Sequence, residues 1–306
     1  MSELYVLRDL SQSRWAKPLM GLERALVRGD REKTGRAYQK LYHALLLCGA
    51  KSLGDAAVSD LLSLETPLSE LAMRGTPLPE GLKAGVLLDL ERFAALVLRD
   101  WQGELSRLLD RTLPPLTALR GPADEDFSAA FEAPFVKSLE GGAWEEALAL
   151  LERYYRRHGA GSLARFEAFR WVDGGLKGID HPAKPELVRL IGLERQLARL
   201  QANTEAFLAG LPAHHALLYG PRGSGKSTAV RALLPPYSAQ GLRLIELHPQ
   251  DMADMVSVME CLRGRPHAYV LFVDDLSFED HSGYGPLKTL LEGSLTERPE
   301  NVLVYA

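Results

Sequence analysis

Eight consecutive residues, Gly220 to Ser227, follow the pattern G-x-x-x-x-G-K-S, which is typical of a phosphate-binding loop. Glycine in such a loop permits backbone angles and a close approach of the main chain that a larger residue would block. The pattern predicts that loop N–H groups bind phosphate oxygens, that Lys226 reaches the β- and γ-phosphates, and that the Ser227 hydroxyl ligates Mg²⁺. The expected phosphate contacts are Gly220, Pro221, Arg222, Gly223, Ser224, Gly225, Lys226, Ser227 and Thr228.

The segments on either side of this loop fit the same chemistry. An apolar run, Ala216–Tyr219, precedes it and predicts a strand, and Thr228–Leu234 follows it with a helical pattern. Strand, loop and helix in this order direct backbone N–H groups and the positive end of a helix at one point. We therefore expect ATP with Mg²⁺ as the ligand.

A second group of residues could hold the metal. The apolar run Tyr269–Val273 predicts a strand buried on both faces, and it ends in Asp274 and Asp275. Ligands of open α/β sheets bind at the carboxyl ends of the strands. Asp274 is therefore expected to hold Mg²⁺ together with Ser227, and Asp275 to orient the attacking water. Asp275 and Lys226 are the expected catalytic residues.

The surrounding pattern predicts the sheet that must position these residues. Strands are expected at 215–220, 242–247, 269–274 and 301–306, with helices at 226–234, 250–263 and 285–296 between them. Alternating strands and helices favour a parallel sheet with right-handed crossovers, as in P-loop proteins. The fold class is therefore α/β, with a nucleotide-binding core at residues 186–306.

The first half of the chain has a different pattern. Leu82, Val86, Leu90, Phe93, Val97 and Trp101 recur at spacings of three and four, which predicts an amphipathic helix. Residues 1–165 are therefore expected to form an all-helical domain. Between the two domains, 166–179 predicts a small hairpin around Asp173-Gly174, and a proline-containing linker extends to 185.

Composition limits the classes of protein that fit. The chain has 306 residues, 46% of them hydrophobic and 25% charged, and its net charge is −4. This mild acidity does not indicate a nucleic-acid-binding protein, although it leaves room for a local basic patch. Cys48 and Cys261 are isolated in the sequence and suit a reducing compartment. No run is long and apolar enough to cross a bilayer, so we expect a cytoplasmic protein.

Several strings of residues resemble AAA+ ATPases. Leu190-Ile191-Gly192 is similar to the segment that packs around adenine in that superfamily, which implies adenine contacts for Ile191 and Gly192. The region 165–306 further resembles a bacterial family of AAA+ ATP-binding proteins without a settled cellular role. The strings that carry this likeness are Asn203–Phe207, Leu218–Gly220, Gly241–Glu246, Asp274–Glu279 and Arg298–Val302. The resemblance implies a homo-oligomeric ring with an arginine supplied in trans.

Two features depart from the AAA+ pattern. Asp275 stands where AAA+ enzymes usually have Glu, one methylene longer, so we expect slow hydrolysis. The sequence also ends at Ala306, before the polar sensor residue, the fifth strand and the helical lid of that superfamily. A truncated chain is the favoured explanation. It would leave 215–220 as an exposed apolar edge, and it predicts weak nucleotide binding and little turnover.

Three functions are compatible with these residues. The first is a hydrolysing AAA+ motor or switch that acts on a macromolecular target, with the helical half as an adaptor for a protein partner. The second is a module that binds ATP, hydrolyses it negligibly, and changes partners with nucleotide occupancy. The third, a P-loop kinase for small molecules, needs an acceptor pocket and a basic lid that the sequence after Asp275 does not suggest.

Overall fold

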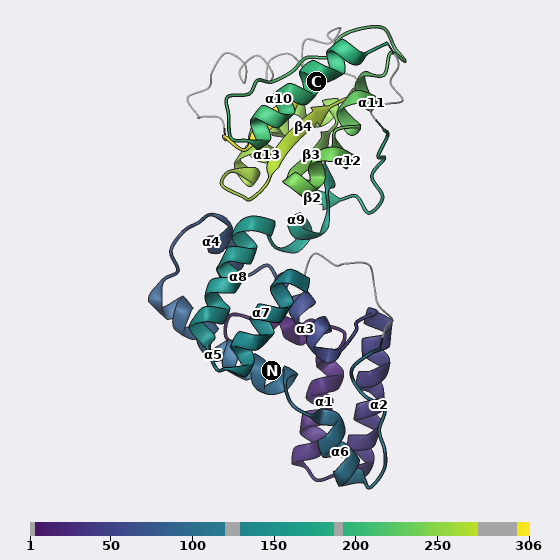
Figure 1. Cartoon of the computed structure of the whole chain (residues 1–306), viewed down its shortest axis with the longest axis vertical. Coiled ribbons are helices and arrows are strands. Elements are labelled where there is room, and N and C mark those ends of the chain that lie inside the picture. Colours follow the sequence, from purple (N-terminus) through teal and green to yellow (C-terminus); the bar gives the residue numbers. More distant parts are fainter. Residues whose placement is uncertain (1–3, 120–128, 187–191, 275–298) are drawn as a thin grey trace. The chain divides into compact units, whose positions relative to one another are not determined.

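The computed structural model describes residues 4–119, 129–186, 192–274 and 299–306. The chain divides into two compact units, Met1–Arg156 and Arg157–Ala306 (Figure 1). This division precedes the boundary at residue 165 that the sequence pattern suggested. The difference arises because the short helix α9 (Gly161–Arg165) contacts β2 (Gly175–Gly178) of the second unit.

The first unit is helical throughout its described residues. Side chains of Asp30, Ser52, Thr66 and Asp100 accept backbone N–H groups at the starts of four of its helices, which fixes where these helices begin. The segments are η1 (Arg8–Gln12), α1 (Ala16–Val27), α2 (Arg31–Cys48), α3 (Leu53–Leu62), α4 (Pro67–Met73), α5 (Glu80–Val97), α6 (Trp101–Leu109), α7 (Ala129–Glu140) and α8 (Trp144–His158). The prediction of a helical first half is confirmed.

The predicted amphipathic helix is shorter than its apolar pattern. Helix α5 ends at Val97, and Trp101 begins α6. The break occurs because the Asp100 side chain accepts the N–H of Gly103 and so starts a new helix. Val86, Leu90 and Phe93 of α5 are buried, as the stripe predicted.

The second unit contains a five-stranded sheet in the order β2-β1-β3-β4-β5. Its strands are β1 (Ala168–Val172), β2 (Gly175–Gly178), β3 (Leu242–Leu247), β4 (Ala268–Val273) and β5 (Val302–Tyr305). Strands β1 and β2 form an antiparallel hairpin, and β1, β3, β4 and β5 pair in parallel. The hairpin was expected, but its pairing with β3 was not.

Most of the predicted strands are confirmed, and the first is much reduced. Residues 242–247, 269–274 and 301–306 correspond to β3, β4 and β5 within two residues at each end. The expected strand 215–220 makes one parallel bridge, Ala216 to Tyr305, at the edge beside β5. Its backbone bonds run from Ala216 N to Val304 O (2.9 Å) and from Leu218 N to Ala306 O (2.7 Å).

The helices of the second unit lie where the sequence predicted them, but they are shorter than predicted. They are α9 (Gly161–Arg165), α10 (Glu194–Leu208), α11 (Lys226–Arg231), α12 (Leu234–Tyr237), η3 (Ser238–Gln240), η4 (Pro249–Asp254) and α13 (Met255–Leu262). The helix expected at 226–234 is divided into α11 and α12. Pro235 and Pro236 favour this division, because proline donates no backbone N–H to a preceding turn. The helix expected at 285–296 lies outside the described residues.

One face of the sheet packs against α10, α11 and α12. The core on that face contains Leu197, Leu200 and Phe207 from α10, Val230 from α11, Leu234 and Tyr237 from α12, and Leu242, Leu244, Val270, Phe272, Leu303 and Tyr305 from the strands. Alternate residues of the strands point to opposite faces. Ala216 and Leu218, which precede the phosphate-binding pattern, pack against this core at the edge of the sheet beside β5.

Candidate functional site

The segment 220–225 forms a loop between the sheet edge and α11. Gly223 and Gly225 have φ values of +75° and +86°, in the left-handed region that residues with a Cβ rarely adopt. Gly225 lies directly before the first residue of α11. The glycines of the motif therefore stand where the backbone turn requires them, and the loop ends at Lys226.

Lys226 folds back across this loop. Its Nζ donates to the carbonyl oxygens of Gly220 and Pro221, at 3.0 Å each. The ammonium group is thus held beside the loop that the sequence assigned to phosphate.

Ser227 lies next to the acidic end of β4. Its Oγ donates to Oδ1 of Asp274 at 2.5 Å, so the two expected metal ligands are in contact. Asp274 directly follows β4, at the carboxyl end of the parallel strands. A hydroxyl and a carboxylate oxygen side by side are ligands that suit Mg²⁺, which usually takes one or two protein ligands together with phosphate and water.

The structure adds three residues to this pair that the sequence analysis missed. Arg231 Nη2 donates to Oδ2 of Asp274 at 3.1 Å and lies 3.5 Å from Oε1 of Glu246. Glu246 in turn pairs with Arg170 of β1, whose Nη2 is 2.6 Å from its Oε2. A chain of alternating charge therefore runs from Asp274, which accepts from Ser227, through Arg231 and Glu246 to Arg170.

The sequence contained a usable sign of one of them. Arg231 stands four residues after Ser227, and residues at this spacing lie on the same face of a helix. Glu246 and Arg170 could be found only from the pairing of β1 with β3, which sets Arg170 opposite Glu246.

Some expected site residues cannot be placed. Asp275 and Ile191 lie outside the described residues. Gly192 is described, and its N–H donates to Oε1 of Glu194 at 2.9 Å. This hydrogen bond lowers the pKa of Glu194.

Two adjoining cavities flank the loop. The larger, about 700 Å³, lies between α10 and residues 214–221, and the smaller, about 220 Å³, is lined by loop residues and Asp274. Residues common to both linings are Leu217, Leu218, Tyr219, Gly220 and Lys226. A ligand with an apolar ring and an anionic tail would fit these cavities, with the ring in the larger cavity and the tail beside the loop.

Hydrogen bonds fix the wall of the larger cavity. Asn203 of α10 donates from Nδ2 to the carbonyl of His214 at 2.8 Å and accepts from the His214 N–H at 3.0 Å. Asn203 and Thr204 also contact the phenol oxygen of Tyr305. Burial raises the pKa of Tyr305, so the phenol stays protonated at neutral pH. These bonds tie α10 to the segment that leads into the loop.

Among the described residues, no three His, Cys, Asp or Glu side chains gather in a way that could hold a metal by themselves. A cation at Ser227 and Asp274 would therefore need ligands from a bound molecule or from water. The same part of the chain contains no helix long and apolar enough to span a membrane.

Comparison with known proteins gives one match. Neither the curated proteins nor the solved structures contain a match to this chain. Residues 164–306, which hold the sheet, the loop and the Ser227–Asp274 pair, match the family model described as "Protein of unknown function (DUF815)".

Proposed function

We propose that the second unit binds ATP with Mg²⁺ and hydrolyses it slowly, as an AAA+ ATPase that acts on a macromolecular target. The observation that carries the proposal is the position of Ser227 beside Asp274 directly after a glycine loop crossed by Lys226. Ser227 and Asp274 are 47 positions apart in sequence, and a phosphate–metal site explains why the folded chain brings them together.

Each residue has a distinct role in this proposal. Loop N–H groups from Gly220 to Gly225 bind phosphate oxygens, and Lys226 exchanges its two carbonyl partners for the β- and γ-phosphates. Ser227 and Asp274 hold the cation, which when bound neutralises charge that develops on the phosphate oxygens. Arg231 keeps the Asp274 carboxylate oriented from the opposite side.

The nucleoside belongs in the larger cavity. Its volume of about 700 Å³ lies in the range of small-molecule sites, roughly 300–1,000 Å³. Leu193, Leu197 and Leu218 supply apolar surface for a base, while Gly220, Ser224 and Lys226 line the end toward the phosphates. Adenine contacts by Ile191 and Gly192 remain part of the proposal through the resemblance to AAA+ enzymes.

Calorimetry with Mg·ATP tests the binding step. In the full chain, Lys226→Ala is expected to weaken binding by roughly 10- to 100-fold, the value of one or two lost charge-assisted hydrogen bonds. Lys177→Ala, at an exposed lysine of β2, is the matched control and should bind as the parent does. No heat with millimolar Mg·ATP or Mg·ADP in the parent protein would overturn the proposal, as would unchanged affinity in the Lys226 variant.

Phosphate release separates an ATPase from a nucleotide-gated binding module. Asp275→Asn should reduce release at saturating Mg·ATP while leaving affinity within a factor of about three. Binding without release above background in the parent protein would support the module instead.

A further inference from the structure

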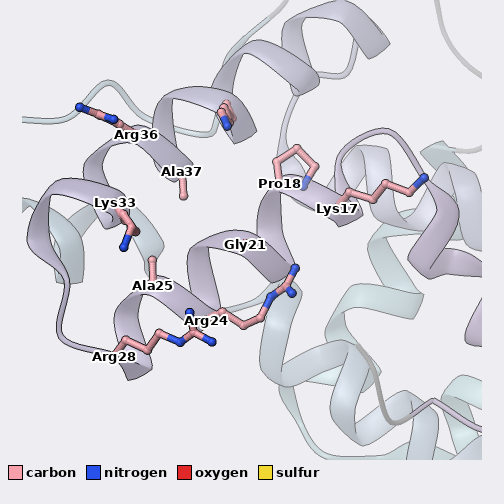
Figure 2. Close-up of a pocket in the computed structure, with 10 residues that line it drawn as sticks. Lys17, Pro18, Gly21, Arg24, Ala25, Arg28, Lys33, Arg36 and Ala37 are labelled. Atoms are coloured by element: carbon pink, nitrogen blue, oxygen red, sulfur yellow. The ribbon is translucent and has the colours of Figure 1, made fainter.

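The first unit contains a basic groove between α1 and α2, with a volume of about 610 Å³ (Figure 2). Six of the residues that line it are basic, and the other four are small or short. The basic residues are Lys17, Arg24, Arg28, Lys33, Arg36 and Lys40, and the remaining four are Pro18, Gly21, Ala25 and Ala37. We call this surface the α1–α2 groove.

The groove follows from the spacing of residues on the two helices. Its basic residues recur at intervals of seven and four along α1 and of three and four along α2, which keeps each set on one face of its helix. Pro18, Gly21, Ala25 and Ala37 line the floor of the groove, by which we mean its uncharged part. A Cβ on Gly21 would meet no atom within 4 Å, so this part of the floor is open. Figure 2 shows basic side chains from both helices around Pro18, Gly21, Ala25 and Ala37, with Lys17 and Arg36 extending in opposite directions.

All six basic residues are exposed, and their charge is only partly compensated. Lys33 pairs with Asp30 at 2.9 Å, and Arg36 pairs with Glu32. Within the described residues, the side chains of Lys17, Arg28 and Lys40 have no ion pair. Residues 16–48 hold seven Lys or Arg and three acidic residues, in a chain whose net charge is −4.

The fold compensates only part of this charge. Arg36 and Lys40 stand four residues apart on α2, a spacing at which like charges destabilise a helix. Arg24 lies in the last turn of α1 and Arg28 is its C-cap, where cations interact favourably with the helix dipole, and Glu32 offsets Arg36. A bound anion would offset the charge that remains along the α1–α2 groove.

The length of the groove selects the class of anion. Lys17 lies in the first turn of α1 and Arg28, eleven residues later, is its C-cap, a span of about 16 Å at the helical rise of 1.5 Å per residue. A single phosphate would reach only a part of this row, whereas a linear polyanion would contact all of it. Arginine, which supplies half of the six cations, binds phosphate through two parallel N–H groups.

We propose that the α1–α2 groove binds the phosphate backbone of a nucleic acid. Aromatic residues are absent from the described lining, so bases have no stacking platform there, and binding should be independent of sequence. An acidic peptide would also need pockets for apolar anchor residues. The uncharged residues of the lining are all small and form no such pocket. A bilayer is flat, whereas these cations line a groove. The negative charge of the whole chain does not oppose this, because screening limits each field to about 10 Å.

Fluorescence anisotropy with a labelled 20-base-pair DNA duplex tests the proposal in the full chain. The variant carries Lys17→Gln, Arg28→Gln and Lys40→Gln. Six phosphate contacts predict a slope of log K against log salt of about −5, and the loss of three reduces it to about −3. The affinity at low salt should fall by roughly tenfold or more.

Two further variants keep the result interpretable. Arg8→Gln, Arg107→Gln and Lys137→Gln remove the same charge from exposed positions outside the groove and should leave slope and affinity unchanged. Lys17→Arg with Lys40→Arg keeps the charge and should retain binding.

Four outcomes would overturn the proposal. They are no duplex binding at 50 mM salt, equal affinity of the parent and the glutamine variant, an equal loss in the control variant, and tighter binding of poly-glutamate or anionic vesicles than of the duplex. Circular dichroism verifies that each variant is folded. The result is independent of ATP binding, because none of these residues belongs to the second unit.

Discussion

At the scale of single residues, the buried carboxylate of Asp89 fixes the backbone of residues 5–7. Its oxygens accept the backbone N–H groups of Tyr5 (2.8 Å), Val6 (2.7 Å) and Leu7 (2.9 Å), and the residue is fully buried in α5. These bonds attach the start of the chain to a helix more than 80 positions away. This role could not be predicted from sequence, because Asp89 between apolar residues resembles any polar residue on a helix surface.

Asp89→Ala should lower the free energy of unfolding by about 3 kcal/mol, since it leaves buried donors without an acceptor. Asp89→Asn keeps one acceptor oxygen and should cost less. Urea denaturation measures both. Asp9→Ala removes an exposed carboxylate and is expected to change stability by less than about 0.5 kcal/mol. A loss of similar size in the Asp9 and Asp89 variants would contradict this account.

The candidate site could be predicted from sequence only where a local motif carries it. Lys226, Ser227 and Asp274 were expected together because a glycine loop and an acidic strand end are both local patterns. Glu246 was not, because its place beside Arg231 depends on how helix α11 packs against β3 in the folded unit.

At the scale of elements, the strands could be predicted but their neighbours could not. The predicted strands match β3, β4 and β5 within two residues, and β4 and β5 are continuous apolar runs, as buried parallel strands usually are. The β1–β2 hairpin was found from its Asp-Gly turn, yet its partner β3 is about 75 positions away. Pairing at this distance depends on the topology of the whole unit, which no local pattern contains.

The amino ends of β3 and β4 hold a buried basic cluster. Arg243 Nη2 lies 3.2 Å from Nε2 of His267, which has a φ of +86° just before β4. Burial, with the charge of Arg243 adding to it, lowers the pKa of His267 to about 3. Burial, with the charges of Arg157 and Arg243, lowers the pKa of His158 to about 4. Both imidazoles are therefore neutral in the folded protein at pH 7.

These shifts predict a loss of stability in acid. In the unfolded chain each histidine titrates near its usual pKa of about 6.5, so below this pH the unfolded state binds more protons than the folded state. The free energy of unfolding should therefore fall as pH decreases from 6.5 toward about 4.

His267→Asn removes one of these groups and keeps a residue that tolerates positive φ. Urea denaturation at pH 7.0 and pH 5.0 should show a smaller decrease for this variant than for the parent. His43→Asn, which changes a histidine of α2 in the first unit, should keep the pH dependence of the parent. Equal pH dependence in the His267 variant and the parent would contradict the prediction.

At the scale of the whole molecule, bulk charge was a poor guide to local charge. The net value of −4 did not indicate a nucleic-acid-binding protein but left room for a local basic patch, and six basic residues line the α1–α2 groove. The sum over a chain of 306 residues cannot reveal how two consecutive helices concentrate charge. Helical periodicity of Lys and Arg along 17–40 was the signal that could have shown it.

The two units should respond separately to nucleotide. Bound Mg·ATP at about 100 times its Kd stabilises a binding unit by about 2.7 kcal/mol. We expect it to slow amide hydrogen exchange in 216–231 and in the strands of the second unit, and to leave α1–α6 unchanged. Mass spectrometry of peptides from both units measures this. Equal protection in both units would contradict the assignment of the nucleotide to residues 157–306.

The ion pairs that connect Asp274 to Arg231, Glu246 and Arg170 affect which substitution of Ser227 or Asp274 is the better test. Neutralising Asp274 would strip Arg231 of one of its two carboxylates and let it turn fully to Glu246, so the disturbance would spread as far as the edge hairpin. Removing the Ser227 hydroxyl leaves every one of those charges in place. Ser227→Ala is therefore the better substitution for testing whether Mg²⁺ binds at this site, because it leaves the ion pairs unchanged.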